Sequence, residues 1–141
     1  MVDALRRSSR WVKPPLGCII DLRPADVVPD VEFGLPDGSI TRVGGLVVDQ
    51  ERRARHAAAD AALREVVRRG DLVVLDEEQF WFFRYPVSAG ELREYIATKW
   101  QHTHLDDHTY ARASDIQRAN PNARLWLRER VGIRSLRPSS S

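Results

Sequence analysis

The sequence predicts an α/β fold in which a small mixed sheet is flanked by helices. Short apolar runs rich in β-branched or aromatic residues occur at 17–22, 72–75 and 80–85, and a longer run at 124–136 alternates apolar with polar residues. Between these runs lie segments whose apolar residues recur at helical spacing and which carry capping residues at their ends. The resulting order is helix, strand, hairpin, helix, strand, helices, strand.

Composition indicates a folded chain. Of the 141 residues, 43% are hydrophobic and 30% are charged, and the mean hydropathy is -0.42. This balance predicts a single α/β domain over residues 1–137. Pro138 and the three serines that follow it predict a disordered tail at 138–141.

The same features exclude several classes of partner. The apolar runs are far shorter than the roughly 20 residues that cross a bilayer, so we expect no membrane partner. The arginines of the first ten residues precede no apolar signal segment, and a lone cysteine, Cys18, rules out an internal disulfide, so we expect a cytoplasmic protein. A net charge of only +2 does not favour a nucleic-acid partner.

The chain begins with a short helix, a strand and a hairpin. Apolar spacing predicts a helix over residues 2–11, which the proline pair at 14–15 ends. The run at 17–22 suits a buried strand, with Asp21 and Arg23 at its carboxyl end. Two further runs around the Pro-Asp-Gly turn at 36–38 predict a hairpin over about 31–48.

A long helix is predicted between Asp49 and Gly70. Asp49 can cap its first turn, and Gly70 is placed as a left-handed stop. Its predicted apolar face consists mostly of alanine, so another element should approach it closely. The residues of this face are Ala54, Ala57, Ala58, Ala61, Leu63, Val66 and Val67.

The next segments predict an aromatic strand and two more helices. Four consecutive aromatic residues at 80–83 predict a central strand that is covered on both faces. Ser88 and Glu91 form a capping box, which begins a helix that continues to about Trp100. A weaker pattern predicts a last helix over about 107–118, for which Asp106 or Asp107 is the cap.

The last strand is predicted over 124–136. One face carries Leu125, Leu127, Val131 and Ile133, with Glu129 as the exception, and the other carries Trp126 and the arginines at 124, 128, 130 and 134. That arginine face could bind phosphate or single strands. The favoured interpretation is that the arginine stems cover apolar surface while their heads pair with acidic residues at 76–78 or with Glu129.

Four segments carry a resemblance to a known family. They are WVKPPLGCIIDLRP at 11–24, AADAALREVVRRG at 58–70, FWFFRYPVSAGELREYIATKW at 80–100 and ARLWLRERVGIRSLRP at 123–138. In this order they resemble the carboxy-terminal half of a class I, Rossmann-like AdoMet-dependent methyltransferase. The family's usual turn of one proline and two glycines is replaced here by Pro14, Pro15, Leu16 and Gly17.

The resemblance implies a particular strand order and the absence of the cofactor-binding half. It places strand five at 17–22, strand six at 79–85 and the antiparallel strand seven, at 124–136, between them. Strands one to four, with their glycine-rich turn for AdoMet, have no counterpart, and the sequence contains no Gly-x-Gly triplet. We therefore expect no cofactor bound by this chain alone, and AdoMet only with a partner half.

Without strand four, strand five would expose a backbone edge along Cys18, Ile19 and Ile20. Exposed apolar edges recruit partners. We therefore expect either a homodimer or a separate cofactor-binding half as partner.

Four residues are predicted to contact a small-molecule acceptor. Asp21 and Arg23 stand at the carboxyl end of a strand, where ligands gather in open α/β sheets, although both would also suit a surface turn. His102 and His104 lie in QHTHLDDH at 101–108, whose donor types suit zinc or iron. Because the spacing matches no standard metal motif, we predict no metal site there, and the sequence indicates no catalytic residue.

The predicted function is the acceptor-side portion of a methyltransferase-like protein that is not catalytically competent alone. The alternative is a non-enzymatic, dimerising binding or assembly module.

Overall fold

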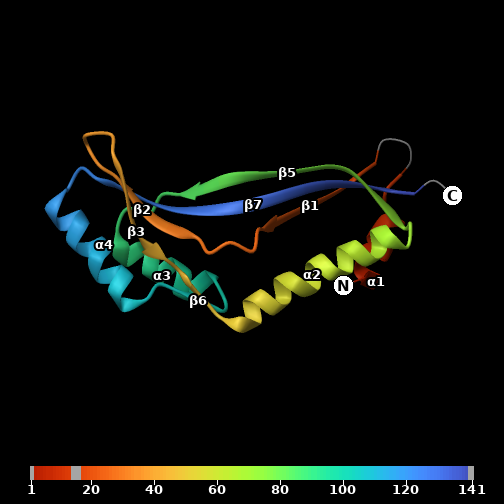
Figure 1. The fold of residues 1–141 in the computed structure, drawn as a ribbon, viewed down its shortest axis with the longest axis horizontal. Helices are drawn as coiled ribbons and strands as arrows, with labels where there is room; N and C mark the ends of the chain where they lie inside the picture. Colours follow the sequence, from red (N-terminus) through yellow and green to blue (C-terminus); the bar gives the residue numbers. More distant parts are fainter. Residues whose placement is uncertain (1, 14–16, 140–141) are drawn as a thin grey trace. The chain divides into compact units, whose positions relative to one another are not determined.

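The computed structural model of the chain, which describes residues 2–13 and 17–139, has a mixed α/β fold with four helices and a small antiparallel sheet (Figure 1). The elements are α1 (Val2–Ser9), β1 (Ile19–Pro24), β2 (Asp30–Gly34), β3 (Ile40–Gly45), β4 (Val47–Val48), α2 (Gln50–Arg68), β5 (Leu72–Arg84), α3 (Ala89–Lys99), β6 (Thr103–His104), α4 (Asp107–Ala119) and β7 (Arg124–Pro138). Their contacts divide the chain into two compact units. Unit 1 comprises the described parts of 1–25, 54–80 and 131–141, and unit 2 comprises 26–53 and 81–130.

Unit 1 consists of β1, the beginning of β5 and the end of β7, with helices α1 and α2. β1 pairs antiparallel with β7, from Ile19 opposite Leu136 to Pro24 opposite Val131. The buried core is small and joins α2 to the sheet through Leu63, Val66, Leu72 and Leu136. Val2 and Leu5 of α1 pack against this core.

Unit 2 consists of the β2–β3 hairpin, the beginning of β7, the end of β5, the short β4–β6 pair and helices α3 and α4. β2 pairs antiparallel with both β3 and β7. Its core is much larger and includes side chains of both helices. The buried residues are Val31, Phe33, Val43, Leu46, Ala89, Leu92, Ile96, Leu105, Ala113, Leu125 and Leu127.

Local capping signals placed the helix ends correctly. Ser88 accepts from the amide of Glu91 at 3.1 Å, although Glu91 accepts from the amide of Val87 rather than of Ser88. Asp106 accepts from the amide of Thr109 at 2.8 Å and thereby begins α4. Gly70 adopts φ 77° two residues after the end of α2, and Gly38 adopts φ 85° in the turn of the predicted hairpin. Both conformations are ones that favour glycine.

Several predictions about faces and strand ends were wrong. β1 begins and ends two residues later than predicted, so Asp21 and Arg23 lie within the strand, opposite β7, rather than beyond it. The alanine face of α2 is displaced, because Ala59 and Ala62 are buried with Leu63 and Val66, while the predicted Ala54, Ala57, Ala58 and Ala61 are exposed. The core lies over a different stripe of the helix than the alanine count suggested.

The aromatic strand is not covered on both faces. The side chains at 80–83 are between 38% and 43% exposed, and they belong to the single long strand β5, which includes the acidic residues at 76–78. β5 is hydrogen-bonded to β7 alone among the described strands, so it is an edge strand rather than a central one. The predicted mixed sheet is also wrong, since every strand pair with a defined register is antiparallel.

The ends of the chain agree only partly with the predictions. Pro138 ends β7, and the amide of Ser139 donates to the carbonyl of Asp71 at 3.2 Å. The remainder of the predicted tail, at 140–141, and the proline turn at 14–16 lie outside the described residues.

Candidate functional site: an ion-pair cluster beside a cavity

Asp21 and Arg23 belong to a cluster of charged side chains in unit 1. Arg23 binds Asp21 at 2.8 Å through Nε and Asp60 of α2 at 3.1 Å through Nη2. Arg134 of β7 binds Glu77 of β5 at 2.7 Å through Nε, and its Nη1 lies 3.5 Å from both Asp21 and Asp60. Two arginines and two aspartates thus form a closed ring to which Glu77 is attached.

The strand register explains why these residues meet. Asp21 lies directly opposite Arg134 in the antiparallel β1–β7 pair. Because strand side chains alternate, Asp21 and Arg23 share the face that bears Ile19, which packs against the core next to α2. Burial alone would lower the pKa of Arg134, but hydrogen bonding to Glu77 and the charges of Asp60 and Asp21 raise it. The cluster therefore holds Arg134 firmly in its charged form.

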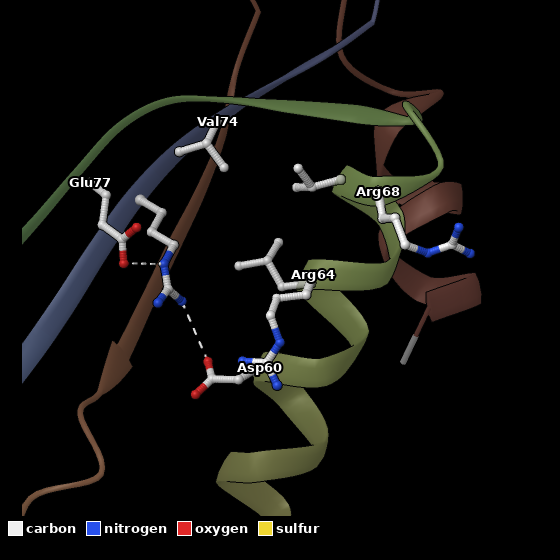
Figure 2. A pocket seen from close by; sticks show the side chains of 8 residues that line it. Asp60, Arg64, Arg68, Val74 and Glu77 are labelled. Carbon is white, nitrogen blue, oxygen red and sulfur yellow. Dashed lines mark hydrogen bonds and ion pairs between the residues drawn. The ribbon is translucent and has the colours of Figure 1, made fainter.

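A cavity of about 430 Å³ lies beside this cluster (Figure 2). It is lined by Asp60, Leu63, Arg64, Val67, Arg68, Val74, Glu77 and Arg134. Leu63, Val67 and Val74 form an apolar wall, and the charged groups surround it. A cavity of this size is within the range of small-molecule sites, roughly 300–1,000 Å³.

The two further arginines of the cavity differ in their partners. Arg68 is 2.8 Å from Glu65, and hydrogen bonds from Arg68 and Arg69 lower the pKa of Glu65 to about 2. Figure 2 shows the guanidinium of Arg68 directed away from the group around Asp60. Arg64 has no hydrogen-bond or ion-pair partner among the described side chains.

His102 and His104 belong to unit 2, so the structure does not group the four predicted acceptor contacts in one unit. His102 adopts φ 61°, and its Nδ1 lies 2.8 Å from Asp49 and its Nε2 3.4 Å from Glu51. The pKa of Asp49 is lowered by the amide of Arg52 and by His102. His104 is exposed in β6, opposite Val47. His102 therefore joins a tight turn to the start of α2.

A buried carboxylate in unit 2 was not predicted as a site residue. Glu129 is 7% exposed and lies 3.4 Å from Arg52, which also donates to Thr103 at 2.6 Å and stacks over Trp100. Burial raises the pKa of Glu129, while Arg52 and Arg84 oppose that shift. The sequence did contain a signal that could have identified Glu129, since it is the single acidic residue on the otherwise apolar face of the last strand.

Two arginines of the arginine face of β7, Arg128 and Arg134, form ion pairs with carboxylates. Arg134 binds Glu77 as the favoured interpretation predicted, whereas Arg128 binds Asp30 and Glu32 of β2 instead. Trp126 donates to Glu32 at 2.8 Å and lies over Gly34, where an added Cβ would meet its ring at 2.6 Å. The arginines at 124, 128 and 130 stack on Tyr85 or Trp81.

Two glycines of unit 2, Gly44 and Gly34, pack closely against neighbouring side chains. Gly44 packs so closely on Thr109 that an added Cβ would lie 2.6 Å from the hydroxyl oxygen of that threonine. Gly34 similarly packs on Trp126. In the described part of the chain, no group of three or more His, Cys, Asp or Glu side chains is arranged to hold a metal ion.

Comparison with protein-family models, curated proteins and solved structures found no match. Among the described helices, none has both the length and the apolar character that crossing a membrane requires.

Proposed function

We propose that this chain is the acceptor-side portion of a methyltransferase-like protein: it binds a small-molecule methyl acceptor and relies on a separate half for AdoMet. The observation that carries the proposal is the strand order β1–β7–β5. β7 pairs antiparallel with β1, and it also pairs with β5. The resemblance implies this order, in which strand seven lies between strands five and six.

The free edge of β1 also supports the proposal. β1 pairs with β7, and no other described strand pairs with it. Ile20 and Leu22 of this strand are 54% and 57% exposed. An edge with such side chains favours pairing with a further strand, as strand four of a cofactor-binding half would provide.

The cavity of unit 1 supports the acceptor side of the proposal. Asp21 and Arg23 do not line it, but they fix Asp60 and Arg134, which do. A rigid charged cluster next to an apolar wall is the combination that orients a small ligand. Asp21 and Arg23 would therefore position the groups that bind the acceptor rather than contact it.

Calorimetric titration with AdoMet and with its demethylated product tests the proposal. The chain alone should show no saturable binding. The chain mixed with a cofactor-binding half, encoded upstream in the same frame or by a neighbouring gene, should bind AdoMet and transfer its methyl group.

A test variant on β1 and a control variant on β3 identify the strand edge that the cofactor-binding half uses. Ile20→Lys should weaken the pairing, because it places a charge on the free edge of β1. The control variant Ile40→Lys, at a 64% exposed position of β3, should leave the pairing of the two halves unchanged. Micromolar binding of AdoMet by the chain alone, or no binding by the mixture, would contradict the proposal.

A second candidate function, self-assembly, is favoured by the self-complementary charges of β1. If two copies paired antiparallel about Leu22, Asp21 of each copy would face Arg23 of the other, and such symmetric contacts are typical of twofold dimers. Sedimentation of the chain alone should then show a dimer.

A mixing experiment separates self-assembly from the first function. Asp21→Arg and Arg23→Asp should each be monomeric, since like charges would face each other in either homodimer. An equimolar mixture of the two should form a dimer, because it restores opposite charges. Monomers at all concentrations, for the original chain and for the mixture, exclude this candidate.

A further inference from the structure

We propose that the cavity of unit 1 takes a ligand with a compact apolar body and one anionic group, such as an aromatic carboxylate. The inference deepens the proposed function and rests on it only in calling this ligand the methyl acceptor. Whether the ligand binds is a separate question that needs no AdoMet.

The apolar body is indicated by the wall of the cavity. Leu63 and Val67 project from α2, and Val74 projects from β5, on the side of the sheet where Leu72 is buried. Val74 remains 37% exposed, whereas Leu63 is only 6% exposed. An apolar ligand that covered Val74 would remove this exposed surface from water and gain the usual hydrophobic stabilisation.

The anionic group is indicated by the balance of charges around the cavity. The arginines at 23, 68, 69 and 134 are bound to the four carboxylates of Asp21, Asp60, Glu65 and Glu77. Arg64 is the one arginine of the lining that has no such partner among the described side chains. One positive charge at the cavity is therefore left for a ligand.

Arg64 places its unpaired charge in the lining of the cavity, on the same helix as Asp60 of the ion-pair ring. Arg64 lies one helical turn after Asp60, so both project from the same face of α2 (Figure 2). Asp60 is already bound by Arg23 and Arg134 and therefore does not attract a ligand cation strongly. A carboxylate can instead accept both N–H groups of the Arg64 fork.

Three probes of the same shape and different charge test the inference on the intact chain. These are 2-naphthoate, 2-naphthol and 2-naphthylmethylamine, titrated without AdoMet and followed by calorimetry. The chain should bind naphthoate best and the amine worst, by about tenfold between naphthoate and naphthol, as expected for a charged hydrogen bond.

Matched variants assign the effect to the cavity. Arg64→Gln should reduce naphthoate affinity about tenfold and leave naphthol affinity unchanged, because it removes only the charge. Arg53→Gln, at an exposed position of the same helix outside the lining, should change neither. Val74→Trp should abolish binding of both naphthoate and naphthol, because the indole ring would fill the cavity.

The outcomes separate this inference from the proposed function. Equal affinity for the three probes, or an Arg64→Gln variant that binds naphthoate as well as the original chain does, overturns the ligand class. Naphthoate binding together with failure of the cofactor-half experiment would leave the ligand site standing and remove methyl transfer. The reverse result would retain methyl transfer and refute the ligand class.

Discussion

The two units differ in the size of their hydrophobic core clusters. Unit 2 encloses eleven buried core residues between its strands and the helices α3 and α4. Unit 1 has a core cluster of only four buried residues among those described, and on the other side of its β1 strand Ile20 and Leu22 are more than half exposed. The difference teaches that unit 2 has the more extensive core, although its aromatic residues at 81–83 stay 38–43% exposed, whereas unit 1 has a small core beside a free edge and a cavity, the features that bind other molecules.

The largest expected effect tests whether the core of unit 2 is closed. Phe33 is fully buried, so Phe33→Ala should lower the free energy of unfolding by about 3–5 kcal/mol, because it leaves a cavity. Phe82→Ala, at a 43% exposed position, is the control and should cost much less. Urea unfolding followed by circular dichroism measures both. Equal losses would show that the core does not depend on Phe33.

A smaller effect tests how closely the β2–β7 pair of unit 2 is packed. Gly34→Ala should cost about 1–3 kcal/mol of unfolding free energy, because its methyl group would overlap the ring of Trp126. Gly90→Ala is the matched control, since its methyl group meets nothing nearer than 3.7 Å, and it should stabilise α3 by up to about 1 kcal/mol. Thermal unfolding of the two variants compares them, and a harmless Gly34→Ala would contradict the close packing.

The cost of burying a charge in unit 2 is tested by pH. Because burial raises the folded-state pKa of Glu129, the folded state holds its proton more tightly than the unfolded state. The stability of the original chain should therefore fall as pH rises from the normal glutamate pKa through the raised one. Against Glu129→Gln, which does not titrate, the original chain should therefore lose stability over this pH range. A relative gain over the same range would mean that Arg52 and Arg84 outweigh burial.

The smallest expected effect tests whether the side chain of Leu22 on β1 lacks packing partners in the isolated chain. Leu22→Ser should change the unfolding free energy by no more than about 0.5 kcal/mol, because the side chain is 57% exposed. Measurement at low protein concentration isolates the single chain. A loss above about 2 kcal/mol would mean that Leu22 is packed in the isolated protein, and the contrast between the units would fail.

Most of the elements could be predicted because their signals are local. A capping serine or aspartate acts on an amide three residues away, as Ser88 and Asp106 do, and a glycine such as Gly70 ends a helix by its own backbone freedom. The apolar face of β7 was likewise predicted correctly from the alternation of residues, since Leu125, Leu127 and Val131 are all buried. These predictions needed no knowledge of neighbouring elements.

The candidate site could be predicted only in part. Asp21 and Arg23 were identified from their place near a strand end, but their partner Asp60 lies in the middle of a helix with no distinguishing pattern. His102 was identified from its neighbours in the sequence, yet it contacts Asp49, which lies far from it along the chain. The arginine–carboxylate pairs of unit 1 depend on the register of β1 against β7, which the sequence of either strand alone does not specify.

The sequence by itself thus determined the number and order of helices, the hairpin turn and the alternation of the last strand, because hydrophobic period and capping act within a few residues. Only the tertiary structure decided which stripe of α2 is buried, that the aromatic residues of β5 lie at an edge, and that Arg134 meets both Asp21 and Asp60. Those outcomes depend on which elements pack together, and burial is set by the neighbour as much as by the residue itself.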